Sequence, residues 1–164
     1  MTTATPKTST AAQAVVIPAT MKATRFRNPA RAFAFCYQLF KADTRFAKRP
    51  ELAKRMARQV KAGQYLFIID AGHIVGFTSW IRTTSEQGAA WAAGAKPFAE
   101  EMVTSKDADA IVVEHWCAAG AAAQKLLAEK LLAVTGDADR VYGRAELSKG
   151  RMIPFKLEKK DLHA

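Results

Sequence analysis

Residues 111–127 constrain the fold and the chemistry of this chain more than any other stretch. They read IVVEHWCAAGAAAQKLL, in which β-branched residues precede an acid–imidazole pair, Glu114 and His115. A turn made of Ala and Gly follows, and a helix-forming segment begins at residue 121. A strand that passes through a small-residue turn into a helix can hold a phosphate or pantetheine group against bare backbone N–H donors. The pattern therefore predicts a binding turn with two ionisable side chains directly before it.

The other apolar patterns predict one α/β domain, a mixed sheet with helices packed on it. The expected helices span residues 29–44, 50–62, 85–102 and 121–134, and the expected strands span residues 64–70, 74–82, 111–117, 141–146 and 151–157. The order is thus α-α-β-β-α-β-α-β-β. The domain is expected over residues 25–158, with a disordered Thr/Ala-rich segment at 1–24 and a polar tail at 159–164.

Composition narrows the class of protein. With 164 residues and 49% hydrophobic residues, the chain suits a single globular domain. No apolar run approaches the roughly 18–20 residues that span a bilayer, and a secretory signal is not evident. The two cysteines, Cys36 and Cys117, lie in segments expected to be buried, which favours a cytoplasmic protein with reduced thiols. Walker, dinucleotide-binding and zinc-finger motifs are absent from the sequence.

The positive charge is concentrated in one stretch. Residues 22–61 contain twelve Lys and Arg but only two acidic residues, whereas residues 62–164 are nearly neutral. Such a surface attracts an acidic partner, which could be nucleic acid, an anionic membrane, a polyphosphate cofactor or an acidic carrier protein. The alternative is that these basic residues form a solvent-exposed helix face that binds no partner.

The side chains of residues 114–117 offer several kinds of chemistry. Strand alternation predicts that His115 and Cys117 share one face, with Glu114 and Trp116 on the other. A His–Cys pair could act as a base and nucleophile in thiol catalysis, or it could supply two of the ligands of a metal site. The sequence has no second Cys/His pair to complete a zinc site. Glu114 in an apolar strand should either pair with a cation or act as an acid or base, because burial of a lone carboxylate is costly.

The turn that follows has two interpretations. Small residues before a helix let a ligand approach the backbone, and the helix dipole favours negative charge there. Alternatively, the alanines only pack the helix closely on the sheet. The expected cofactor-binding residues are Trp116, Cys117, Ala118, Ala119, Gly120, Ala121 and Ala122.

From about residue 33 to residue 157 the chain resembles the toxin-activating lysine acyltransferases of the RTX toxin systems, which are relatives of the GNAT fold. The resemblance is carried by Gln64-Tyr65, by Gly76-Phe77-Thr78-Ser79-Trp80, by Val113-Glu114-His115-Trp116 leading to Gly120, and by the closing segment from Arg140 through Gly150 to Phe155. It implies a GNAT-like acyltransferase that moves a fatty acyl group from acyl carrier protein to a lysine ε-amine. It also implies that the turn at Gly120 lies where GNAT proteins hold pantetheine.

One family motif is altered. The family's first helix ends in Ser-x-x-His-Arg, and this chain has Lys41 and Thr44 at the Ser and His positions, followed by Arg45. The family's central-strand aspartate is Glu114 here. Because a threonine hydroxyl is not a general base near neutral pH, the chemistry is expected to have moved to Glu114, His115 or Asp43, or to have been lost.

The sequence therefore predicts an N-acyltransferase that uses an acyl-carrier-protein or CoA thioester as co-substrate and a protein or peptide amine as acceptor. No cofactor is expected to stay bound, no metal site is expected, and a homodimer is possible. Contacts with substrate or partner are expected from Arg45, Arg55, Arg58, Ser79 and Trp80. The alternatives are a non-catalytic member that binds an acyl carrier, lipid or protein, and a nucleic-acid-binding protein based on residues 22–61.

Overall fold

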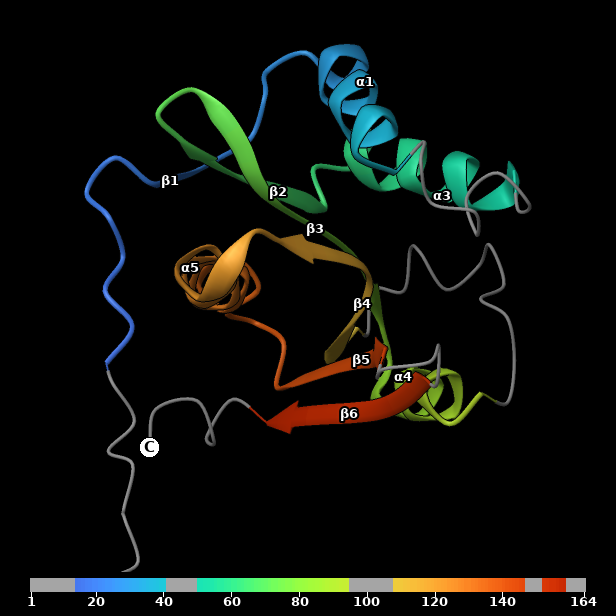
Figure 1. Ribbon diagram of the computed structural model, residues 1–164. Coiled ribbons are helices and arrows are strands. Elements are labelled where there is room, and N and C mark those ends of the chain that lie inside the picture. Colours follow the sequence, from blue (N-terminus) through green and yellow to red (C-terminus); the bar gives the residue numbers. More distant parts are fainter. Residues whose placement is uncertain (1–13, 41–49, 95–107, 147–151, 159–164) are drawn as a thin grey trace, which may run out of the picture.

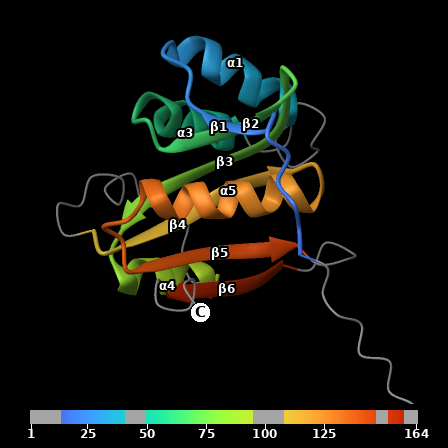
Figure 2. The ribbon, with the colours of Figure 1, turned by 90° about the vertical axis from the view of Figure 1, so that its left-hand side faces the viewer.

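The fold is built on one six-stranded mixed sheet (Figures 1 and 2). The computed structural model describes residues 14–40, 50–94, 108–146 and 152–158. The strands lie in sequence order from β1 to β6, and neighbours are antiparallel except for the parallel pair β4 and β5. The connection between these two contains a helix, as parallel neighbours require. The predicted mixed α/β architecture is confirmed.

The elements follow the predicted order with one addition at the start. The strands are β1 (Lys22–Thr24), β2 (Tyr65–Asp70), β3 (His73–Thr83), β4 (Ala110–Ala118), β5 (Arg140–Glu146) and β6 (Met152–Glu158). The helices are α1 (Pro29–Phe40), α3 (Pro50–Lys61), α4 (Ser85–Ala92) and α5 (Gly120–Val134). The predicted extensions of α1 to residue 44 and of α4 to residue 102 fall largely on residues 41–49 and 95–107, outside the described part.

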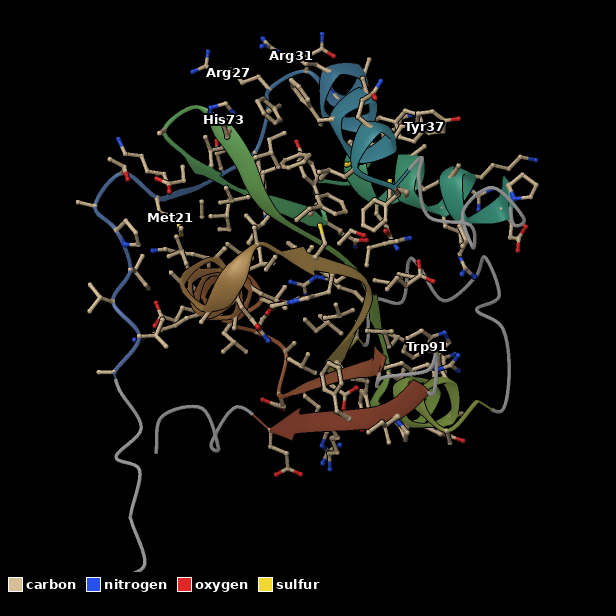
Figure 3. The ribbon with its side chains drawn as sticks, in the orientation of Figure 1. Met21, Arg27, Arg31, Tyr37, His73 and Trp91 are labelled. Atoms are coloured by element: carbon tan, nitrogen blue, oxygen red, sulfur yellow. The ribbon has the colours of Figure 1, made fainter. Side chains whose placement is uncertain are left out.

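The sheet begins before the predicted start of the domain. Lys22–Thr24 pair antiparallel with β2 and form the edge strand, although this segment had been predicted to be disordered. Ile17 and Met21 pack against the core beneath α5, and Figure 3 shows Met21 between the N-terminal segment and that helix. Composition alone did not reveal these contacts, because a few apolar side chains among small polar residues make them: Ile17, Met21 and Ala23.

Helices cover both faces of the sheet. α5 lies on one face over Leu66, Trp80, Ile111 and Val113. On the other face, α1 and α3 cover the β2–β3 side, and α4 covers β4 and β5. The sheet is thus buried on both sides, which explains why β4 begins with four consecutive buried apolar residues.

Two helices show how the sequence sets their ends. α3 presents Met56 and Val60 to the core and ends before Gly63, whose φ of +70° suits glycine. α4 is capped at its N-terminus by Thr84, whose side chain accepts a hydrogen bond from the Gln87 N–H. None of the helices that the structure describes is both long and apolar enough to cross a membrane.

Candidate functional site

A β-bulge in the middle of β4 defines the site. Val113 lies opposite Trp80, and His115 lies opposite Ser79, so Glu114 between them has no partner on β3. A bulge of this kind turns two successive side chains toward the same face. Both Glu114 and His115 accordingly contact groups on the face covered by α3. The prediction that strict alternation separates Glu114 from His115 is wrong, because the extra residue interrupts the alternation.

A continuous polar chain runs from α3 through β4 and β3. Gln59 Nε2 donates to Glu114 Oε2 (2.5 Å), and the Ser79 hydroxyl donates to Gln59 Oε1 (2.6 Å). Ser79 Oγ also lies 2.8 Å from His115 Nδ1. Arg55 of α3 joins the chain through an ion pair with Glu114. We call Arg55, Glu114, Gln59, Ser79 and His115 the Glu114 relay.

The charge on Glu114 is nearly buried. Its side chain is 3% exposed, and Arg55 Nη2 lies 3.0 Å from Oε1, in a contact that is ionic rather than a well-aligned hydrogen bond. Burial raises the pKa of Glu114, while the Arg55 charge and the Gln59 hydrogen bond act in the opposite direction. Of the two roles expected for Glu114, a cation partner or an acid or base, the structure shows the cation partner, and it is Arg55.

His115 is held from several sides. The residue is 7% exposed, its ring meets the Phe40 ring edge-on at a centroid distance of 5.5 Å, and its carbonyl accepts from Thr78 Oγ1. An imidazole fixed in this way has two distinguishable nitrogens, of which Nδ1 faces Ser79.

Beyond the bulge, β4 separates from β5. The two strands pair only through Ala110, Ile111 and Val112, and β4 continues to Ala118 with no β5 partner recorded. The β5-facing edge of residues 113–118 is therefore not bonded to a strand within the described residues. Backbone N–H and C=O groups on such an edge can bind an extended ligand.

The small-residue turn follows this open edge directly. Ala119, Gly120 and Ala121 are exposed, and Ala119 offers no side-chain cap to the first turn of α5. Ala123 is fully buried, and Ala118 packs against the same core cluster. Gly120 has φ of +86° and open space around it. The exposure of residues 119–121 leaves room for a ligand at the first turn of α5, whereas Ala118 and Ala123 pack against the core, so each interpretation of the turn describes part of it.

Other predicted site residues lie elsewhere. Trp80 is 2% exposed in the core under α5, with the Arg25 guanidinium over its ring, so it is not placed to contact a substrate. Trp116 is 37% exposed on the α5 side by alternation. Arg58 is exposed on α3. Asp43 and Arg45 fall outside the described residues.

The two thiols of the described region are poorly suited to thiol catalysis. Burial raises the pKa of Cys117 and raises the pKa of Cys36 to about 12, so both thiols stay protonated near neutral pH. His115 contacts Ser79 rather than a cysteine. No group of three or more His, Cys, Asp or Glu side chains within the described ranges is placed to hold a metal ion.

Gln59 is the site residue that the sequence reasoning missed. It lies three residues after Met56 and is 2% exposed, on the buried stripe of α3. A polar side chain on the apolar face of an amphipathic helix was the available signal. A shallow hollow of about 610 Å³ lies at the other end of the sheet, near Lys22 and Gly72, and includes none of the relay residues.

Comparisons with known proteins give a likeness of fold only. No family model matches the sequence, and no curated protein matches it. Among solved structures, the protein is similar to "GphF GNAT-like decarboxylase in complex with isobutyryl-CoA", with 16% identity and a TM-score of 0.43. The match covers 59% of this chain and 53% of that one, so it spans about half the length of that neighbour.

Proposed function

We propose that the protein is an N-acyltransferase that transfers an acyl group from a thioester donor to an amine. The observation that carries this proposal is the β4 bulge, which places Glu114 and His115 on one face where the strand also leaves β5. A carboxylate–imidazole pair lies beside an open strand edge and an uncapped helix N-terminus. The resemblance to toxin-activating lysine acyltransferases implies the same reaction.

In this proposal His115 is the general base. It removes a proton from the acceptor ammonium, the amine nitrogen attacks the thioester carbonyl, and the C–N bond forms. The C–S bond then breaks, and the departing thiolate takes up a proton to give the free thiol. Backbone N–H groups along residues 113–118 supply donors for the carbonyl oxygen. Glu114, whose carboxylate is held by the Arg55 ion pair and the Gln59 hydrogen bond, orients the centre instead of exchanging protons.

The donor would lie along the free edge of β4, with its phosphate end at the start of α5. Residues 119–121 are small and exposed, and no side chain caps the first turn of α5, which suits a pantetheine phosphate or diphosphate. Both CoA and the phosphopantetheine arm of a carrier protein have this chemistry. A molecule in the gap between β4 and β5 could reach the face that carries His115.

The basic surface favours an acidic carrier protein as donor. Arg27 and Arg31 point outward at the α1 end of the molecule in Figure 3, and Lys54 and Lys61 are exposed on α3. Complementary charge accelerates association and makes it salt-dependent. We expect Lys54→Glu together with Lys61→Glu to slow transfer from acyl carrier protein and to leave transfer from acyl-CoA unchanged.

The test is release of free thiol from acyl-CoA and acyl-carrier-protein donors of several chain lengths, with primary alkylamines and lysine-bearing peptides as acceptors. Amide product is followed by mass spectrometry. We expect amine-dependent thiol release by the wild type and by His73→Gln, and its loss in His115→Gln. His73 is the matched control because it is exposed at the start of β3, well away from β4 (Figure 3).

Two outcomes would reject the proposed enzymatic function. Donor binding without discharge to any amine would identify a non-catalytic carrier-binding protein. A steeply salt-dependent affinity for nucleic acid, without any affinity for either donor, would identify the basic stretch as a nucleic-acid surface.

A further inference from the structure

Arg144 of β5 is a half-buried cation that no carboxylate of the described residues pairs with. Its guanidinium lies over the Trp91 ring, 4.2 Å from the ring centroid, and Nη2 donates to the Trp91 carbonyl. A guanidinium carries five N–H donors, and this carbonyl takes one of them. Burial lowers the pKa of Arg144, with no carboxylate in the described ranges acting in the opposite direction. The side chain still carries its charge, because arginine stays protonated in proteins.

Arg82 of β3 shows the kind of partner that fits such a side chain. Its Nη1 and Nη2 donate to the two carboxylate oxygens of Asp137, at 2.5 and 2.7 Å, and these hydrogen bonds raise the pKa of Arg82. A carboxylate matches the guanidinium fork with two parallel hydrogen bonds. Arg144 has the same fork, already oriented by the ring beneath it. The missing partner of Arg144 is therefore best supplied by a carboxylate from another molecule.

Arg144 lies beside the gap between β4 and β5. Val112 and Tyr142 are the last residues that the two strands pair, and Arg144 follows two residues after Tyr142. Side chains two apart on a strand share a face, and Tyr142 packs on α4 as Arg144 does. Extending the parallel register by two residues brings Arg144 level with Glu114. Arg144 therefore stands across the gap from the bulge of β4.

The face that carries Arg144 is also the face that carries His115. Figure 1 shows α3 and α4 on one side of the sheet and α5 on the other, and Figure 3 shows Trp91 on the α4 side. His115 contacts Phe40 and Ser79 on the side that α1 and α3 cover. Since α5 covers the opposite side, an acceptor would reach His115 from the side of α3 and α4. That approach passes Arg144.

We propose that Arg144, oriented by Trp91, binds a carboxylate of the acceptor, so that the enzyme selects amines that carry a carboxylate close by. This site rests on the proposed function, which supplies the acceptor. An acidic side chain near a lysine and the α-carboxylate of a free amino acid have the same chemistry here. An arginine that only holds the last turn of α4 would make the same contact with Trp91, but it would not distinguish a carboxylate from an amide.

The test measures acceptor affinity of the full chain with and without CoA, so that binding is separated from acyl transfer. The probes are two N-acetylated, C-amidated tripeptides, Glu-Lys-Glu and Gln-Lys-Gln, and the pair free lysine and lysinamide. Binding is followed in ¹⁵N spectra through the Nε–H of Arg144 and the indole N–H of Trp91. We expect a carboxylate probe to shift the Arg144 signal and to bind about 10-fold tighter than its matched amide. A preference in the first pair identifies an acidic side chain, and one in the second pair identifies an α-carboxylate.

Two variants of β5 separate the proposed site from the general positive charge of the protein. Arg144→Met removes the guanidinium and keeps a long side chain over Trp91, and we expect it to abolish the carboxylate preference. Arg140→Met is the matched control, because it removes an arginine from the start of the same strand and lowers the net charge equally. It should keep the wild-type preference. Backbone amide spectra establish that each variant is folded.

Equal affinities within both pairs in the wild type would overturn the proposal, as would a preference that persists in folded Arg144→Met or is lost equally in Arg140→Met. If Arg144→Met fails to fold, the wild-type spectra decide, because a preference that leaves the Arg144 Nε–H signal unshifted also overturns it. Failure of the proposed function gives a different pattern. The carboxylate preference would then depend on Arg144 as expected, while the wild type would transfer no acyl group to any amine.

Discussion

The two halves of β4 have opposite characters, although they belong to one strand. The first half, through Val112, is buried on both faces and paired on both edges. The second half begins with the bulge at Glu114, loses β5 as a neighbour and ends at an exposed turn. Stability and binding are thus divided along the strand, because backbone groups used for pairing are not available to a ligand.

The largest effect is expected from the imidazole in the second half. His115→Gln should lower the rate of acyl transfer by about 10²–10⁴-fold, the usual contribution of a general base. Donor affinity, measured by calorimetry with CoA, should stay within a factor of two or so of wild type, since the backbone edge is retained. A variant that transfers acyl groups at the wild-type rate would assign the base elsewhere.

A cavity in the first half should affect stability instead. Ile111 is fully buried under α5, so Ile111→Ala should lower the free energy of unfolding by about 2–5 kcal/mol. Urea denaturation measures this change. Donor affinity of the folded protein should not change. If Ile111→Ala lowers the free energy of donor binding by more than it lowers the free energy of unfolding, the division between the two halves is wrong.

The turn before α5 allows a matched pair of glycine substitutions. Gly120 and Gly94 both have φ of +86° with open space around them, so alanine at either site should cost about 1–2 kcal/mol of stability. Only Gly120→Ala should also weaken CoA binding, because only Gly120 belongs to the proposed phosphate-binding turn. Equal donor affinities in the two variants would remove the turn from the site.

The smallest effect concerns pH. Burial raises the pKa of Glu114 above its ordinary value of 4.5, so the native state keeps this proton to higher pH than the unfolded chain does. The contribution of Glu114 to stability is therefore greatest at low pH and decreases as pH rises through the native pKa. Relative to Glu114→Gln, the wild type should lose stability from about pH 4.5 upward, as measured by denaturation midpoints at several pH values. The opposite trend would show that the charge of Arg55 affects the pKa of Glu114 more than burial does.

Periodicity was sufficient to predict most of the fold, because apolar patterns reflect which face of each element is buried. The mixed sheet and the helix after β4 follow from runs such as 111–117 and 121–134. The same reasoning failed at Glu114, because a bulge changes the face of the sheet on which the following side chains lie and the sequence pattern does not indicate the bulge. It also missed Gln59, whose partners Ser79 and Glu114 are 20 and 55 residues away.

Hydrogen exchange along β4 tests the central claim most directly. Amide exchange is measured with and without a non-reactive thioether analogue of acyl-CoA, which would lie on the free edge of the strand. The account predicts new protection of amides within residues 113–118 and in the first turn of α5, with no change for residues 110–112. Protection confined to other parts of the molecule, or none at a saturating analogue concentration, would contradict it.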